Sequence, residues 1–334
     1  MSKCKFGKNG PCLPNGIIKK LSDKILSKKS SDNNSSNSES VKISIASSDI
    51  NIPESFSNPT DSSNFSNTDT SIKDNNKTIK KIAEKLQCSA SNDGSNEICI
   101  LKKLEKINKN TKFKSVVDAT IAKYFQPITK SFDKNYWINN TEIDNIQYQF
   151  QTTFDGYYYS NIHMIDLIMF NPQNEKLIEN SKKIKPITEI NFVNELKKNN
   201  ANFTYNGELK NFGLVVNTDL STNGGIHWFS IFIDFTATPI TIEYFNSSGY
   251  DIRNVKFKKY FINLADEITL KYKKCIFVKV TDIQHQRNDT SNCGGYALYY
   301  IYERLKSTPY SHFSDNKITD ENIEKFREVL FRLD

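Results

Sequence analysis

Four short runs of β-branched and aromatic residues in the C-terminal half limit the possible folds of this chain most strongly. Each run is bounded by Gly, Asn, Pro or Ser, as β-strands commonly are. They are FGLVVN (212–217), HWFSIFIDF (227–235), ITIEYF (240–245) and CIFVKVT (275–281). Four strands so close in sequence predict a single sheet.

Helical patterns separate and follow these strands. Residues 255–274 place apolar side chains at helical spacing, and further helices are predicted from Cys293 and from Thr319. The last of these has acids in its first turn, where the helix dipole favours them. The pattern predicts an α+β fold in which a central mixed β-sheet is flanked by helices.

The N-terminal third has a different composition. Between residues 31 and 80, 23 of 50 positions are Ser or Asn, too polar to offset the entropy lost on ordering. Short amphipathic helices are predicted at 78–87 and 96–109. We therefore predict a basic arm (1–30), a disordered Ser/Asn-rich linker (31–77), a helical accessory region (78–130) and a C-terminal domain (131–334).

The positive charge of the chain is concentrated in the basic arm. The net charge is +7, and residues 1–30 hold eight lysines against one acid, 8 − 1 = +7. The arm also places Ile17, Ile18, Leu21 and Ile25 near one helical face. It can be a solvated tail, or it can contact an acidic partner such as nucleic acid, or a membrane surface.

The cysteine pattern and the hydropathy give expectations about the cellular compartment of the protein. The six cysteines lack CxxC spacing, so we predict no metal site, no cofactor and no disulfide framework. There is no signal-peptide-like apolar segment and no run of 18 apolar residues. We expect a protein of a reducing compartment that is neither secreted nor transmembrane.

Cys293 is the candidate nucleophile, because it lies at the predicted first turn of a helix in CGGYALYYIYERL. A helix N-terminus and a basic histidine both favour a thiolate, and Gly294 and Gly295 leave the backbone open to a substrate carbonyl. The candidate base is His227, at a loop-to-strand junction. Taken alone, a histidine beside Trp228 at a strand start is more often structural.

Two further roles are needed for acyl transfer. A third group must orient the imidazole, and Asn246, Asp234 and Asp251 are the near candidates. Asp234 is seven residues along the same strand from His227, about 23 Å away at ~3.3 Å per residue, whereas Asn246 ends the neighbouring strand. Gln286 or Gln284 could donate to the oxyanion; the alternative is that both decorate an exposed loop.

The order His, Asn, Gln, Cys-Gly resembles the cysteine proteases of the adenain and SUMO-protease superfamily. The stretches NTDLSTNGGIHWFSIFIDF, ITIEYFNSSG and VTDIQHQRNDTSNCGGYALYYIYERL resemble more closely the polyprotein-processing proteases of African swine fever virus and related large DNA viruses. The resemblance implies an adenain/Ulp-like fold. It implies Cys293 as nucleophile, His227 as base, Asn246 as orienting residue and Gln286 in the oxyanion hole, with Gln284 as the alternative.

The same resemblance implies a cysteine endopeptidase that needs no cofactor and cuts viral core polyproteins after Gly-Gly, in the virion and the host cytoplasm. Trp228 would then line a narrow tunnel, or else be an ordinary buried tryptophan. Even with a neutral orienting amide, the Cys-His pair can be ionised before substrate binds. The alternatives are a deSUMOylase or deubiquitinase acting on host conjugates, and a binding protein with a degenerate protease domain.

Overall fold

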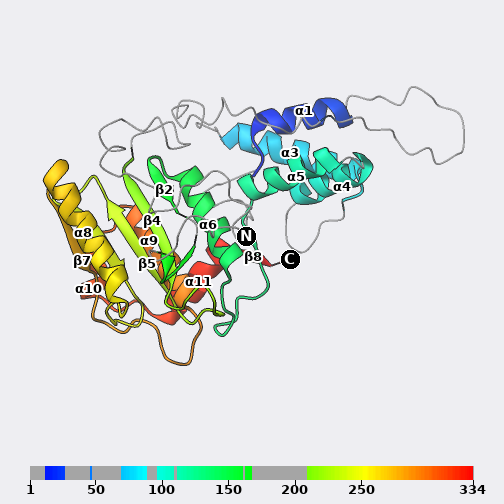
Figure 1. The fold of residues 1–334 in the computed structure, drawn as a ribbon. Helices are drawn as coiled ribbons and strands as arrows, with labels where there is room; N and C mark the ends of the chain where they lie inside the picture. Colours follow the sequence, from blue (N-terminus) through cyan, green and yellow to red (C-terminus); the bar gives the residue numbers. More distant parts are fainter. Residues whose placement is uncertain are drawn as a thin grey trace, which may run out of the picture. The chain divides into compact units, whose positions relative to one another are not determined.

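The computed structural model describes residues 12–26, 46, 69–88, 96–108, 111–160, 162–167 and 209–333. These residues belong to two compact units, one ending at Gln126 and the other beginning at Pro127 (Figure 1). The division lies beside the boundary predicted between residues 130 and 131. Among the described residues, no helix is both long and apolar enough to cross a bilayer.

The second unit contains a mixed sheet in the strand order β2-β4-β5-β6-β7, with β3 also paired to β4. The β4–β5 and β5–β6 pairs are antiparallel, and the other pairs are parallel. Its strands are β2 (Tyr157–Tyr159), β3 (His163–Met164), β4 (Asn211–Asn217), β5 (Trp228–Asp234), β6 (Ile240–Phe245) and β7 (Cys275–Lys279). The four predicted strands and the α+β fold class are confirmed.

Two long helices cover opposite faces of this sheet (Figure 1). On one face, α8 (Val255–Lys271) packs Phe257 and Phe261 among the odd-numbered side chains of β5, such as Phe229. On the other, α9 (Cys293–Leu305) packs against the even-numbered ones: Arg304 lies over the ring of Phe232. Because alternate residues of a strand point to opposite faces, the continuous apolar run of β5 serves both helices.

A buried ionic cluster fixes α9 on its face of the sheet. Glu243 is fully buried and accepts hydrogen bonds from Arg304 Nε (2.8 Å) and Arg304 Nη2 (2.9 Å) and from the Tyr300 hydroxyl. Arg304 also pairs with Asp234 Oδ2 at 3.0 Å. Since a buried carboxylate needs its partners, these bonds allow α9 little freedom to shift along the sheet.

Shorter elements complete the second unit. Helix α6 begins with a capping box between Asn139 and Glu142 and lies beside α9. The bounds are α6 (Asn140–Thr153), α10 (Ser311–Asp315) and α11 (Asp320–Leu330), with a two-stranded parallel sheet of β1 (Ile128–Thr129) and β8 (Arg332–Leu333). Helix α6 and β2 lie in a segment rich in Phe, Tyr and Trp, for which the sequence analysis predicted no helix or strand.

The first unit is a helical cluster with its own core. Its helices are α1 (Asn15–Leu26), α3 (Asp69–Lys85), α4 (Asn96–Asn108) and α5 (Thr111–Tyr124). Ile17, Ile18, Leu21 and Ile25 of α1 are buried in this core, so they are not an open membrane-binding face. Helix α3 begins at Asp69, so the predicted disordered linker extends too far; most of that linker lies outside the described residues.

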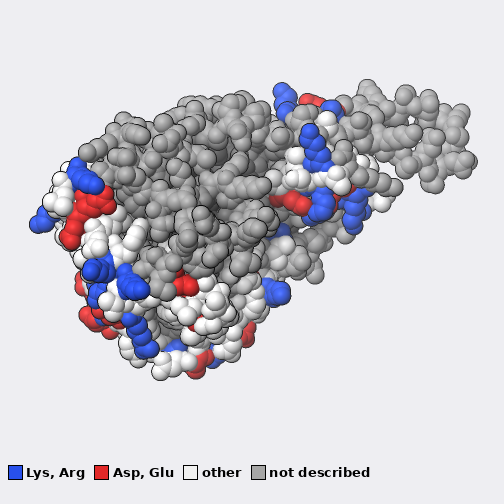
Figure 2. All heavy atoms as spheres, viewed as in Figure 1, with Lys and Arg blue, Asp and Glu red and all other residues white. Residues whose placement is uncertain are grey.

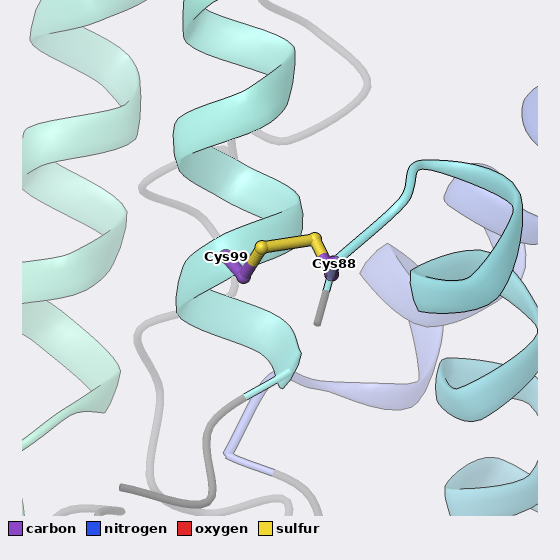
Figure 3. Close-up of a disulfide and its surroundings, with 2 residues drawn as sticks. All are labelled: Cys88 and Cys99. Atoms are coloured by element: carbon purple, nitrogen blue, oxygen red, sulfur yellow. A yellow bond between two sulfur atoms is a disulfide. The ribbon is translucent and has the colours of Figure 1, made fainter. Parts of the chain in front are cut away.

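The prediction of no disulfides was wrong for this unit. Cys88, just after α3, is bonded to Cys99 in the first turn of α4 (Figure 3), and Cys12 is also disulfide-bonded. The packing of α3 on α4 brings the Cα atoms of Cys88 and Cys99 within 5.9 Å of each other. The positions of the cysteines along the sequence do not reveal this proximity. The expectation of a reducing compartment therefore loses its basis.

Candidate active site

Cys293 begins α9 and is only 2% exposed. Burial raises the pKa of its thiol to about 11, while hydrogen bonds from the backbone N–H groups of Trp228, Gly294 and Cys293 itself oppose that rise. The contact with Trp228 matters for the site, because Trp228 is the neighbour of His227 in the chain. The N-terminus of α9 and the start of β5 thus meet at the sulfur.

The two glycines after Cys293 allow this close approach. A Cβ on Gly294 would lie 3.3 Å from Cδ1 of Trp228 and 3.3 Å from Cβ of Ile138, and one on Gly295 would lie 2.5 Å from Cγ2 of Ile323. Both glycines are buried. The sequence suggested that they expose backbone to a substrate; the structure shows instead that they let protein side chains pack against the first turn of α9.

His227 and Asn246 are in direct contact. His227 Nε2 lies 2.7 Å from Asn246 Oδ1. Asn246 Nδ2 donates to the Tyr244 hydroxyl at 2.9 Å, and Oδ1 also accepts from the Ser248 N–H at 3.0 Å. These bonds fix the orientation of the amide, so Nε2 must carry the proton and Nδ1 is left as the basic nitrogen. Burial lowers the pKa of His227, and the bond to Asn246 partly offsets this effect.

The other candidate orienting residues lie elsewhere. Asp234 pairs with Arg304, and Asp251 pairs with Lys258. Asn246 is thus the one of the three candidates that the structure brings to His227.

His285 is a structural residue of the core. It is fully buried, its Nδ1 accepts from the Ile318 N–H at 3.0 Å, and its Nε2 lies 3.2 Å from Thr281 Oγ1. Burial lowers its pKa to about 4. Both ring nitrogens are therefore engaged, and neither is available as a base.

The two candidate glutamines differ in their hydrogen bonding. Gln284 is exposed, and its amide nitrogen donates to the Gln286 carbonyl (3.1 Å) and to Asn288 Oδ1 (2.7 Å), which uses both hydrogens. The amide nitrogen of Gln286 donates to the Thr290 carbonyl at 2.7 Å. Because that is one bond for two hydrogens, Gln286 has a second hydrogen for a ligand, which favours it over Gln284.

The side chain of Asp320 holds the loop between Gln286 and Cys293 in place by hydrogen bonds. The sequence analysis did not identify this residue. Its buried carboxylate accepts from the Arg287 N–H (2.9 Å), Thr290 Oγ1 (2.7 Å) and Asn292 Nδ2 (2.9 Å). Arg327, also buried, donates to Asn292 Oδ1 at 3.1 Å. The only sequence signal was an acid in the first turn of a helix, which by itself predicts capping.

Within the described part of the chain, no group of three or more His, Cys, Asp or Glu residues could hold a metal ion. The chemistry available at this site is that of a buried thiol, an oriented imidazole and amide donors. Such a set suits nucleophilic attack on a carbonyl group.

Comparison with known proteins places these residues in context. Over 123 residues the chain is 42% identical to a protein of African swine fever virus, isolate Tick/Malawi/Lil 20-1/1983, that is named a cysteine protease. Over this segment the chain is similar to that viral protease. Isolate Pig/Kenya/KEN-50/1950 has a protein 42% identical over 123 residues that is named a SUMO-1 cysteine protease. No family model matches the chain.

The extent of the match limits what it shows. The aligned segment is 36% of this chain and 44% of the viral cysteine protease, so less than half of that relative is matched in sequence. The crystal structure of the African swine fever virus protease aligns over 80% of this chain and 91% of its own, with a TM-score of 0.58 and 24% identity. The fold, with its mixed sheet flanked by helices, is therefore shared.

Proposed function

We propose that the chain is a cysteine endopeptidase in which Cys293 is the nucleophile, His227 the base and Asn246 the residue that orients it. The observation that carries this proposal is the 2.7 Å contact between His227 Nε2 and Asn246 Oδ1, next to the Trp228 N–H that bonds the Cys293 sulfur. One strand end thus presents the base and touches the nucleophile. The similarity to proteins named cysteine protease supports the same conclusion.

The pKa shifts favour a general-base mechanism. Burial raises the pKa of Cys293 to about 11 and lowers that of His227, so thiol and imidazole are both neutral before substrate arrives. This differs from the ion pair that the sequence suggested. His227 Nδ1 takes the thiol proton as Sγ bonds the substrate carbonyl carbon, and the imidazolium then protonates the leaving amine. Water, deprotonated by His227, then hydrolyses the thioester.

The developing oxyanion needs donors on the far side of the carbonyl carbon. We assign this role to the second amide hydrogen of Gln286 and to the backbone N–H of Cys293. The first turn of α9 leaves this N–H without a helical partner, and in the free site it bonds the Cys293 sulfur. Loss of one such donor typically costs about 100- to 1,000-fold in kcat.

For the substrate we propose Gly-Gly-Xaa sites in viral structural polyproteins, cut during particle maturation in the virion and the host cytoplasm. Trp228 is 3% exposed, and its Cδ1 lies against the first turn of α9, so little space remains for substrate side chains beside the sulfur. The rival substrate is a ubiquitin-like conjugate, which the name of one relative suggests.

The test is a pair of substrates given to the full chain. A peptide with an internal Gly-Gly-Xaa site should be cut after the second glycine, and replacing either glycine by valine should abolish the cut. SUMO-1 and ubiquitin conjugates are offered in parallel. Cleavage of the conjugates alone would reject the polyprotein assignment, and cleavage of neither would reject the protease assignment.

Replacing Asn246 by alanine should slow turnover without abolishing it. The variant loses the acceptor that holds His227 Nε2–H, so the imidazole populates the wrong tautomer and orientation. We expect kcat to fall about 100-fold. Asn246→Asp keeps an acceptor at the same position and should recover most of this loss. Unchanged kcat in Asn246→Ala would remove the orienting role.

Replacing Asp320 by asparagine should lower both stability and activity. The Asp320 carboxylate accepts hydrogen bonds from three donors. In the asparagine variant an NH2 group replaces one of its two oxygens, so a donor would face a donor. We expect the free energy of unfolding to fall by about 2–3 kcal/mol. We also expect kcat/KM to fall, because the loop between Gln286 and Cys293 loses hydrogen bonds to residue 320. Glu321→Gln, the same change one residue later on an exposed ion pair, is the control and should alter neither. Equal behaviour of the two variants would contradict this role.

We also propose nucleic acid as a partner of the basic N-terminal part, through residues 1–30 and through a row of lysines on α3. Lys73, Lys77 and Lys81 are exposed and spaced one turn apart, about 6 Å, close to two phosphate steps on one DNA strand (~6.8 Å). Figure 2 shows basic side chains on the described surface of this unit. The burial of the apolar face of α1 argues against a membrane surface.

Changing these three lysines to glutamine should weaken binding of a labelled mixed-sequence DNA duplex. Each lost phosphate contact reduces the slope of log K against log salt by about 0.9, so up to about 2.7 in all. The control removes equal charge from the other unit, with Lys259, Lys317 and Lys325 changed to glutamine. Fluorescence anisotropy at several salt concentrations measures the affinity of each triple variant for the duplex and the slope of log K against log salt. Equal affinities of the two triple variants would reject the α3 surface.

A further inference from the structure

We propose that Ser247 is a positioning residue, which holds Gln286 for its role toward the oxyanion. The inference rests on the function proposed above and adds a residue to it. Ser247 follows Asn246 directly at the end of β6, so the turn from Asn246 to Gly249 serves both halves of the site. Its first residue orients the base, and its second holds the oxyanion donor.

Three hydrogen bonds join Ser247 to the loop that carries Gln286. The Ser247 hydroxyl donates to Gln286 Oε1 at 3.0 Å. The Ser247 carbonyl accepts from the His285 N–H at 2.8 Å and from the Gln286 N–H at 3.0 Å. Ser247 is 1% exposed, so water does not compete freely for these bonds. Both backbone and side chain of Gln286 are therefore tied to one residue.

The hydroxyl of Ser247 and the carbonyl of Thr290 together fix the amide of Gln286. Thr290 accepts from Nε2 at 2.7 Å, and Ser247 donates to Oε1 at the other end. Reversing the amide would place Oε1 against the Thr290 carbonyl, oxygen against oxygen. Without the Ser247 hydroxyl the side chain is held at one end only, so its free N–H samples positions in which it cannot meet the oxyanion.

The turn itself is built to stay in place. Gly249 has a φ of +72°, and a Cβ there would lie 2.7 Å from the Asp282 carbonyl oxygen. Its N–H bonds the Asn246 carbonyl at 3.0 Å. Only glycine combines this conformation with this contact, so the turn lies directly against the segment that leads from β7 to Gln286.

Ser248 provides a matched control. Its hydroxyl donates to Asn246 Oδ1 at 2.8 Å, whereas that of Ser247 donates to Gln286. Ser247→Ala therefore perturbs Gln286, the proposed oxyanion donor, whereas Ser248→Ala perturbs Asn246, which orients the base.

The experiment is a double-mutant cycle on the full chain, with kcat and KM measured on a Gly-Gly-Xaa peptide. Ser247→Ala should lower kcat about 10-fold and leave KM within about 2-fold, since an oxyanion donor acts in the transition state. In a Gln286→Ala background, Ser247→Ala should change kcat less than about 2-fold, because the group it positions is absent. Ser248→Ala should have the same effect in both backgrounds.

A second pair separates positioning from packing. Ser247→Thr and Ser247→Val have the same shape and differ in the hydroxyl, so any strain from the added methyl group is common to both. We expect kcat to be higher in the Thr variant by about 10-fold, as for serine over alanine. Equal kcat values in the two would overturn the positioning role, as would an undiminished effect of Ser247→Ala in the Gln286→Ala background.

The two failures can be told apart. If Gln286→Ala has wild-type kcat, the oxyanion assignment and the role of Ser247 fall together. If Gln286→Ala is impaired but the effects of Ser247→Ala and Gln286→Ala multiply, only the role of Ser247 falls.

Discussion

Replacing Cys293 by alanine should abolish peptide cleavage, with kcat/KM reduced by at least about 10⁵-fold, as for other covalent catalysts that lose their nucleophile. The side chain is small and buried at the first turn of α9, so the loss of one sulfur atom leaves the fold intact. The acyl-enzyme cannot form without the sulfur atom of Cys293, which supplies the nucleophile. Substrate binding, in contrast, should persist.

Cys275 gives this prediction a stringent control. It is the other free cysteine among the described residues, and it lies in the core cluster beneath α8. Burial raises its pKa to about 12. Cys275→Ala should therefore retain activity, and mass spectrometry after treatment with a Gly-Gly aldehyde or vinyl sulfone should locate the adduct on Cys293. Cleavage by Cys293→Ala at the wild-type rate would contradict the assignment and favour the degenerate binding protein.

Much of the fold of the second unit follows from local sequence pattern. The runs that became β4, β5, β6 and β7 are short, β-branched and bounded by turn residues, and α8 and α11 show clear apolar stripes. Such patterns depend on neighbours in the chain, so they can be recognised without knowledge of the fold. The contact of His227 with Asn246 could be anticipated as well, because consecutive strands of a sheet tend to be adjacent.

Other features depend on packing between distant segments. Asp320 is 28 residues from Asn292 in sequence, and nothing local distinguishes its carboxylate from an ordinary helix-capping acid. The Cys88–Cys99 bond requires α3 and α4 to pack side by side. The apolar face of α1 looked available to a membrane because its partners in the helical core lie far along the chain. In each case the sequence identifies the type of side chain but not the distant residue that it contacts.

Replacing His227 by alanine should lower kcat by about 10⁴-fold, within the range for loss of a general base. The pH dependence carries the more specific prediction. Burial lowers the pKa of His227 below its ordinary 6.5, so the imidazole is neutral at pH 7 and becomes protonated only as the pH falls through the lowered value. Protonation removes the base. Wild-type kcat/KM, which reports the pKa of the base in the free enzyme, should therefore fall on the acid side with a midpoint below 6.5.

Without His227, the thiol must ionise on its own. Because the pKa of Cys293 is raised to about 11, the residual rate of His227→Ala should climb about tenfold per pH unit through neutral and mildly alkaline pH. His312→Ala is the control, since His312 lies on α10 and bonds its own helix end at Asn316; the wild-type profile should persist in that variant.

Alkylation of Cys293 by iodoacetamide distinguishes the two starting states of the wild-type pair. A neutral pair predicts alkylation that accelerates with rising pH above neutrality, because the thiolate is a minor species there. A preformed ion pair predicts fast alkylation that is independent of pH between about 5 and 8. The burial of both groups favours the first outcome. The second would mean that the charge of the imidazolium outweighs the desolvation of the sulfur, and that the proton moves before substrate binds.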